Sequence, residues 1–224
     1  MCEERILVLC DFDGTASTVD VGNELLDRFT GDGWEDIDRD YCDGKIGSRI
    51  AYIKIAPLFR GSRAHMLDFV FEKAVLDPHF KDFYGYCRRR GMDLKIISDG
   101  LDFYIEAILK RNGFPEIEFF SNTVIFQEDG RLSIAFPPPS PECGQCGNCK
   151  SRIVQQSRLF YDRIIYIGDS YSDVCPAKNA DLVFAKNILF QKCSENGTHC
   201  IHYDHFDDIQ KYLACQSERV ALKP

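Results

Sequence analysis

Short apolar runs alternate with amphipathic segments along most of this chain. The first run, Ile6 to Cys10, has no polar interruption and predicts a buried β-strand. Comparable runs at residues 94–97, 164–167 and 182–185 predict three further strands, and segments with helical spacing separate most of them. Strands that alternate with helices are typical of a parallel α/β sheet. We therefore expect an α/β fold with a Rossmann-like parallel sheet as its core.

Two regions depart from this rhythm. Between residues 16 and 77 the apolar positions have helical spacing in four successive segments, and no strand pattern occurs. We expect this span to be a small helical cap domain inserted after the first strand, with residues 1–15 and 78–224 forming the core. Further along, two apolar stretches flank a turn at residues 127–130, which predicts a β-hairpin. Two helical segments are expected at the C-terminal end.

A polar cluster follows each of three predicted strands. Because the carboxyl ends of parallel strands meet at one edge of a sheet, we expect the clusters to converge there. In extended backbone Asp11 and Asp13 point to the same side, and two carboxylates so close require a cation or a shared proton. The pattern predicts a site for a hard metal ion or for phosphate chemistry. The clusters are Asp11 with Asp13, Ser98-Asp99-Gly100, and Asp169-Ser170 with Asp173.

Charge and hydropathy exclude several classes of protein. The net charge is −8, so there is no basic excess to neutralise nucleic-acid phosphates, and we expect no nucleic-acid partner. No apolar run approaches 20 residues, so we expect no transmembrane helix and no membrane association. The first residues lack the basic and then apolar layout of a signal peptide. We expect a cytoplasmic protein, and the sequence does not indicate an oligomeric state.

The chain contains eleven cysteines, most of them in apolar periodic surroundings that predict buried thiols. One loop differs, because Cys143, Cys146 and Cys149 have the spacing of a structural zinc site. The alternatives are a glycine-rich turn with free thiols, or a disulfide. The sequence does not select a fourth zinc ligand, and the candidates are Cys175, Cys193, Cys200 and His199.

The motif Asp11-Phe12-Asp13-Gly14-Thr15 after the first strand resembles that of the haloacid dehalogenase superfamily, specifically its phosphohydrolases. Ser98 is similar to the second motif of that superfamily, Lys150 to the third, and Gly168-Asp169-Ser170 with Asp173 to the fourth. The insert at residues 16–77 is similar to the small cap of the phosphoserine-phosphatase-like branch. Within that branch the chain looks most like the methionine-salvage phosphatases that act on 2-hydroxy-3-keto-5-methylthiopentenyl-1-phosphate.

The resemblance implies a Mg²⁺-dependent phosphomonoester phosphatase that works through an aspartyl-phosphate. Asp11 would be the nucleophile, and Asp13 would protonate the leaving oxygen and then activate water. Mg²⁺ would be bound by Asp11, the carbonyl of Asp13 and Asp169, with Asp173 in support. The phosphate oxygens would be held by Ser98, the amide of Asp99 or Gly100, and Lys150.

Several of these residues have ordinary structural alternatives. Asp173 would cap the following helix, and Asp99 is better suited to capping its helix than to binding metal. Lys150 would instead be a solvated cation at the start of a helix. The neighbouring Arg152 is a second candidate for the phosphate-binding role.

The predicted cap has its own candidates. Asp20 would either face the non-phosphate part of the substrate or act as a helix N-cap, and we weigh the two equally. Asn23, one turn further on, would join Asp20. Arg49 and Arg60 would meet an anionic substrate, but solvation at the surface is the stronger interpretation.

A cap over the pocket favours a small phosphorylated metabolite over a phosphoprotein. Alternative substrates are phosphocholine, phosphoethanolamine, thiamine phosphate and phosphoserine. Phosphoserine is less favoured, because Gly14 stands where a serine follows the second aspartate in its phosphatases. The alternative outside enzymes is a phospho-acceptor signalling module, but such modules lack both the insert and the second aspartate. A silent binding protein is disfavoured by the intact motifs.

Overall fold

The computed structural model describes residues 4–141 and 144–221, and within them it contains one seven-stranded sheet. All neighbouring strands are parallel except the hairpin of β3 and β4, which is antiparallel. The predicted α/β architecture and the predicted hairpin are therefore confirmed. From edge to edge the order is β4 (Leu132–Ala135), β3 (Phe119–Phe126), β2 (Asp93–Leu101), β1 (Ile6–Cys10), β5 (Arg163–Gly168), β6 (Leu182–Ala185) and β7 (Ile201–His202).

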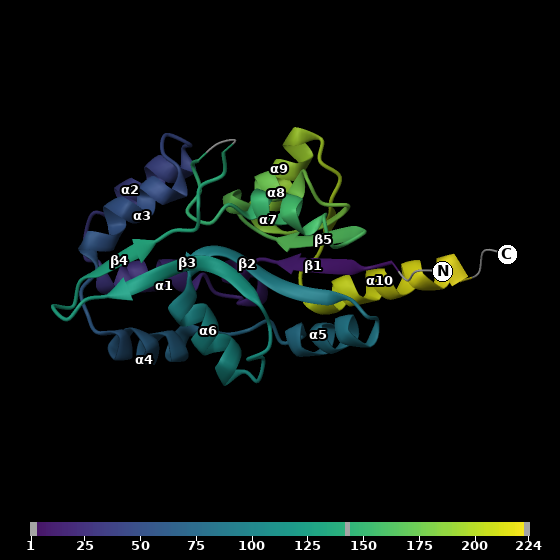
Figure 1. Cartoon of the computed structure of the whole chain (residues 1–224), viewed down its shortest axis with the longest axis horizontal. Helices are drawn as coiled ribbons and strands as arrows, with labels where there is room; N and C mark the ends of the chain where they lie inside the picture. Colours follow the sequence, from purple (N-terminus) through teal and green to yellow (C-terminus); the bar gives the residue numbers. More distant parts are fainter. Residues whose placement is uncertain (1–3, 142–143, 222–224) are drawn as a thin grey trace.

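Helices cover both faces of this sheet (Figure 1). Because successive side chains of a strand point to opposite faces, Leu7 and Leu9 of β1 pack on one side and Val8 and Cys10 on the other. Each fully buried aliphatic side chain of this kind stabilises the fold by roughly 1.5–3 kcal/mol. The first face is covered by α7 (Lys150–Ser157), α8 (Val174–Ala177) and α9 (Asn187–Asn196), and the second by α5 (Phe80–Arg89), α6 (Asp102–Arg111) and α10 (Phe206–Ala221).

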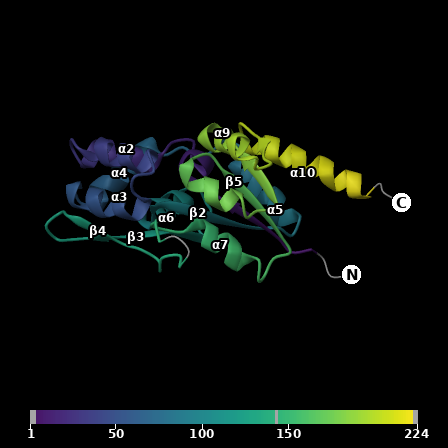
Figure 2. The same ribbon diagram turned by 90° about the horizontal axis from the view of Figure 1, so that it is seen from above.

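Four α-helices lie between β1 and α5 in the sequence, and they lie toward the carboxyl end of β1 (Figures 1 and 2). The chain leaves and rejoins the core through two adjacent segments, because Ser17 and Leu76 form an antiparallel bridge. The amide of Thr18 donates to the Val75 carbonyl over 2.8 Å, which reinforces the pairing. The helices are α1 (Val21–Phe29), α2 (Trp34–Cys42), α3 (Ser48–Ile55) and α4 (Arg63–Lys73).

The sequence misplaces some element boundaries. β2 extends to Leu101, so Ser98, Asp99 and Gly100 lie within its irregular last part and not after it. The two-residue strand β7 is absent from the sequence-based description, because so short a pairing leaves no alternating pattern. None of the described helices has both the length and the apolar character needed to cross a membrane.

Candidate active site

The turn after β1 brings Asp11 to the edge of the sheet. The amide of Asp11 still donates to the Ile167 carbonyl of β5 over 2.9 Å, and the chain then makes a single tight turn through Gly14. Gly14 has a φ of +72°, and a Cβ at this position would clash with the Asp169 carboxylate. The Thr15 hydroxyl donates to Asp169 Oδ1 over 3.1 Å. The sequence Gly14-Thr15 thus allows the end of β5 to approach the first motif closely.

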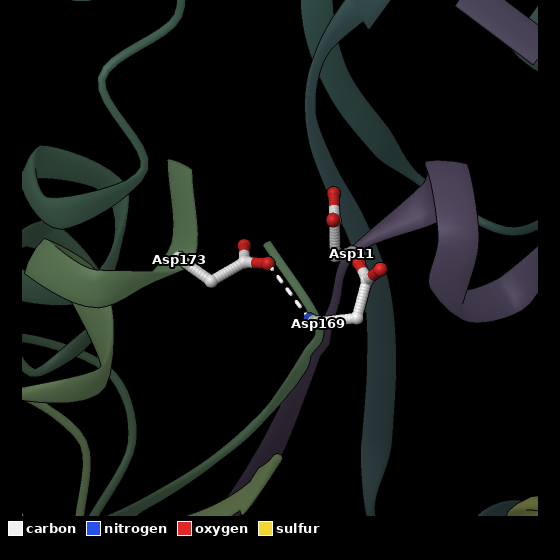
Figure 3. Close-up of side chains that lie close together, drawn as sticks. All are labelled: Asp11, Asp169 and Asp173. Atoms are coloured by element: carbon white, nitrogen blue, oxygen red, sulfur yellow. Dashed lines mark hydrogen bonds between the residues drawn. The ribbon is translucent and has the colours of Figure 1, made fainter. Parts of the chain in front are cut away.

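Three carboxylates meet at this edge. One oxygen from each of Asp11, Asp169 and Asp173 lies within 4.8 Å of the others, from two segments distant in sequence (Figure 3). Hard divalent cations prefer carboxylate oxygens, and these donors fit such an ion. Within residues 4–141 and 144–221, no other group of three or more His, Cys, Asp or Glu side chains meets this spacing. The structure therefore has an aspartate cluster that could hold a metal ion.

Lys150 lies inside the same cluster. Its Nζ donates to Asp11 Oδ1 over 2.6 Å, to Asp173 Oδ1 over 2.7 Å and to Ser172 Oγ over 2.9 Å. The side chain is only 2% exposed, so the interpretation of Lys150 as a solvated cation is wrong. Arg152, the neighbouring candidate, donates instead to the Pro138 carbonyl and borders a separate cavity.

Both carboxylate oxygens of Asp173 accept hydrogen bonds from the protein. Oδ1 accepts from Lys150 and from the Tyr166 hydroxyl, the latter over 2.6 Å, and Oδ2 accepts from the amides of Asp169 and Ser170. Ser170 and Asp173 also form a reciprocal capping arrangement at the start of the next turn. Asp173 therefore caps the following turn and is also one of the three carboxylates of the cluster.

Burial and neighbouring charge set the protonation of this cluster. Burial opposes ionisation of Asp173, but Lys150 and the hydrogen bonds outweigh it and lower the pKa. For Asp11, burial and then the Asp173 charge raise the pKa well above its ordinary value. Burial and Asp173 also raise the pKa of Asp169 to about 6. The positive charge of Lys150 thus neutralises the negative charge of the three carboxylates only in part. A bound cation would favour their ionised forms.

Asp13 has surroundings unlike those of Asp11. Its Oδ1 accepts from the Val21 amide over 3.0 Å, and its Oδ2 accepts from the Tyr104 hydroxyl over 2.6 Å. Burial, followed by the nearby Asp20 charge, raises the pKa of Asp13 to about 7. A carboxyl group with this pKa can both release and take up a proton near neutral pH. The sequence gives no sign of Tyr104, which lies on the apolar side of α6 and resembles a core residue.

The end of β2 holds the other phosphate-binding candidates. The Gly100 amide donates to Ser98 Oγ over 2.8 Å, and Ser98 is buried. Asp99 Oδ1 accepts from the Asn148 amide and from Asn122 Nδ2 over 2.8 and 3.0 Å. Because α6 has Leu101 at its N-cap position and no side-chain cap, the expectation that Asp99 caps this helix is wrong. Asp99 instead fixes the loop that precedes Lys150.

A cavity of about 260 Å³ opens above these residues. Its floor contains Asp11, Asp13 and Lys150, and its opposite wall comes from α1, α2 and α3. Among the described residues, no Lys, Arg or His lines it apart from Lys150. The opposite wall includes Asp20, Asn23, Leu25, Leu26, Asp38, Tyr41, Cys42, Ala51, Tyr52, Ile55 and Phe59.

The candidate residues of the helical insert differ in their position relative to the cavity. Asp20 Oδ1 accepts from the Asn23 amide over 2.8 Å as an N-cap. Asp20 also lines the cavity, and its contact with the substrate stays a prediction. Arg49 and Arg60 do not line the cavity. Arg49 donates to the Pro137 carbonyl, and Arg60 donates to carbonyl groups of its own turn.

The predicted zinc loop is only partly visible, because Cys143 lies outside the described residues. Cys149 is buried directly before Lys150, and neither Cys146 nor Cys149 forms a disulfide. Zinc at this loop stays a prediction.

The chain is similar to known phosphatases in sequence and in fold. Residues 6–193 match the model of a family described as Putative Phosphatase. The 2-hydroxy-3-keto-5-methylthiopentenyl-1-phosphate phosphatase of Brevibacillus brevis is 31% identical, over 94% of this chain and 96% of that protein. The enzyme of the same name from Exiguobacterium sibiricum is 29% identical, over 93% and 96%. A substrate-bound phosphoserine phosphatase structure superimposes with a TM-score of 0.70 at 18% identity, over 95% of this chain and 99% of that one.

Proposed function

The chain belongs to the Putative Phosphatase family of the haloacid dehalogenase superfamily and is a phosphoric monoester hydrolase, and we propose that it dephosphorylates the methionine-salvage intermediate 2-hydroxy-3-keto-5-methylthiopentenyl-1-phosphate. The names of the relatives from Brevibacillus brevis and Exiguobacterium sibiricum support this substrate. The character of the cavity wall supports it independently.

The observation that carries the substrate proposal is the cavity wall facing Asp11. Leu25, Leu26, Ile55 and Phe59 supply apolar surface there, which suits the methylthio end of the proposed substrate. The rest of that substrate, apart from its phosphate, is uncharged. Phosphoserine fits less well, because its carboxylate would meet Asp20 and no cation beyond Lys150 among the described lining residues.

In the proposed reaction, the Asp11 carboxylate attacks phosphorus and the bond from phosphorus to the ester oxygen breaks. Asp13 protonates the leaving oxygen, then removes a proton from the water that cleaves the aspartyl-phosphate, which releases inorganic phosphate and restores Asp11. Tyr104 holds Asp13 in place for both proton transfers.

The phosphate oxygens in this proposal are held by Ser98, the amide of Asp99 or Gly100, and Lys150. Mg²⁺ would be bound by the carboxylates of Asp11 and Asp169 and the carbonyl of Asp13, with Asp173 in support, and would neutralise charge on the transferred group.

Residues 16–77 act in this proposal as the cap that selects the substrate. Their helices supply most of the wall opposite Asp11, and the paired segments around Ser17 and Leu76 join them to the core. A cavity of this size encloses a small metabolite and leaves no room for a folded phosphoprotein.

A second candidate substrate class is the phosphate ester of an amino alcohol. Asp20 and Asp38 both line the cavity, and Tyr41 and Tyr52 lie on the same wall. Carboxylates and aromatic rings together favour an ammonium group. Phosphocholine and phosphoethanolamine satisfy this chemistry, and thiamine phosphate also carries a cation.

A panel of phosphate esters tests these proposals. We expect the fastest phosphate release from 2-hydroxy-3-keto-5-methylthiopentenyl-1-phosphate, slower release from phosphoserine, and loss of activity when EDTA removes Mg²⁺. Faster turnover of phosphocholine or phosphoethanolamine would move the assignment to the second class. A stable aspartyl-phosphate without turnover would instead identify a phospho-acceptor signalling module.

A structural zinc ion on Cys143, Cys146 and Cys149 is a separate proposal. The spacing of the three cysteines supports it. Elemental analysis of protein purified without chelator should find about one zinc per chain if the site exists. A chain free of zinc would rule it out.

A further inference from the structure

The loop at residues 144–149 lies between the catalytic residues and the first turn of α3. The Gly147 amide donates to Ser48 Oγ over 3.0 Å in buried surroundings, and the Arg49 amide donates to the Gln145 carbonyl over 3.1 Å. Gly47 packs so closely on the Gln145 carbonyl that a Cβ would have no room. Three consecutive residues of the helical insert therefore dock directly on this loop.

The Arg49 side chain extends the same contact. Its guanidinium donates to the Pro137 carbonyl over 2.7 Å and to the Cys146 carbonyl over 3.4 Å, and it stacks over the Phe136 ring at 4.6 Å. These partners all belong to the loop or to the segment leading into it. Arg49 therefore secures the insert against the core and does not face the substrate.

On its other side, the loop is bound to the catalytic edge. The Asn148 amide donates to Asp99 Oδ1 over 2.8 Å, and Asn148 Nδ2 donates to the Ser98 carbonyl over 2.9 Å. Two residues later, Lys150 Nζ reaches Asp11 Oδ1. Burial raises the pKa of the Asp99 carboxyl, and the neighbouring Ser48 hydroxyl partly opposes that shift. A displacement of the loop would move Lys150 and the end of β2 together.

We propose that Ser48 is a positioning residue of the phosphatase reaction, which holds the loop at residues 144–149 so that Lys150 and the end of β2 meet beside Asp11. This inference rests on the proposed phosphatase function. The Ser48 hydroxyl accepts from the Gly147 amide in buried surroundings, which an alanine side chain cannot do. Because Ser48 belongs to the insert, complete assembly of the phosphate-binding residues depends on α3 lying over the core.

The test compares three variants in the hydrolysis of para-nitrophenyl phosphate at saturating Mg²⁺, with inorganic phosphate as competitor. For Ser48→Ala we expect kcat to fall on the order of tenfold, the effect of one lost buried hydrogen bond, and inorganic phosphate to inhibit more weakly. Ser48→Thr keeps the hydroxyl and should retain most of the activity. Ser62→Ala is the matched control, because Ser62 lies at the start of another helix of the insert but is exposed, and its hydroxyl accepts from the His65 amide within its own turn.

Thermal unfolding of each variant separates positioning from stability. A Ser48→Ala variant with wild-type kcat and wild-type phosphate inhibition would overturn the inference, as would equal losses in Ser48→Ala and Ser62→Ala. If Ser48→Ala is insoluble, Ser48→Cys replaces it, because a thiol keeps the volume but hydrogen-bonds weakly. A wild-type chain that hydrolyses no phosphate ester would overturn the proposed function and this inference together, whereas an active wild type isolates the role of Ser48.

Discussion

The two walls of the cavity differ in the partners of their carboxylates. On the core side, Asp11 and Asp173 are buried, and both accept from Lys150 Nζ, over 2.6 and 2.7 Å. On the side of the helical insert, Asp20 and Asp38 stand among apolar and aromatic side chains, with no cation among the described lining residues to fix them. An array of paired charges suits charge stabilisation in a reaction, whereas a mainly apolar and aromatic wall suits the choice of substrate. We propose from this difference that the core carries out the chemistry and the insert selects the substrate.

The strongest test of this division is Asp11→Asn. The amide cannot form an aspartyl-phosphate, so we expect kcat for every substrate to fall by at least about 10³-fold. Thermal unfolding should show that the variant folds. Retention of para-nitrophenyl phosphate hydrolysis would show that the nucleophile has been assigned to the wrong residue.

Lys150→Gln should damage both activity and stability. Removal of this cation leaves Asp11 and Asp173 buried without their partner, a change that costs about 3–5 kcal/mol in comparable pairs. Mg²⁺ should recover part of the loss, because the carboxylates would bind it. Urea unfolding with and without Mg²⁺ measures both effects, with Lys81→Gln on the exposed side of α5 as the control. Unchanged stability would contradict the ion-pair geometry.

Tyr104→Phe tests the residue that holds Asp13, the proposed proton-transfer group, in place. Loss of its 2.6 Å hydrogen bond to Asp13 should lower kcat on the order of tenfold and change KM little. Tyr161→Phe removes a similar tyrosine–aspartate bond, to Asp93 at the surface, and should leave kcat unchanged. Equal kinetics for the two variants would remove Tyr104 from the mechanism.

Asp38→Asn addresses the opposite wall and should alter selectivity while leaving the chemistry intact. A half-exposed charge of this kind is worth up to about 1 kcal/mol, so we expect the ratio of kcat/KM for phosphoethanolamine over phosphoserine to fall about twofold to fivefold. Asp36→Asn lies on the same helix, outside the cavity, and serves as the control. A uniform loss for all substrates would place Asp38 with the catalytic residues instead.

The smallest effect, a change in thermal stability, is expected from His205→Gln, where the insert rejoins the core. His205 Nδ1 lies 2.9 Å from Asp77 Oδ2, and this contact raises the pKa of His205 above its ordinary 6.5. Stability from the pair is therefore complete below about pH 6.5 and is lost as pH rises through the folded-state pKa. His205→Gln should lower the melting temperature more at about pH 5.5 than at about pH 8.5. An equal difference at both pH values would contradict the pairing.

Sequence reasoning works best at the ends of the strands. Asp11, Asp13 and Asp169 are readable because each follows an apolar run, and the rules of parallel sheets bring such positions to one edge. The same rules give the order of strands and helices on which the fold prediction depends. They say little about contacts between elements that are distant in sequence.

Residues outside those strand ends are harder to find. Tyr104 and Tyr166 match the apolar periodicity of a helix and a strand, and their hydroxyl groups become functional only through partners on other elements. The role of Ser48 depends on a loop 99 residues away in the chain. Arg49 resembles a substrate ligand in sequence, yet its guanidinium binds carbonyl groups. Sequence indicates the residue type in each case, and only the fold supplies the partner.

The pairing of Ser17 with Leu76 has a consequence for how such enzymes diversify. The two ends of the helical insert lie side by side, so the chain re-enters the core next to the point where it leaves it. An insertion at such a point can be lengthened, shortened or exchanged without disturbing strand register. We therefore expect that an exchanged insert would change the choice of substrate and leave the carboxylates at the sheet edge in place, provided that it keeps the Ser48 contact with the loop at residues 144–149.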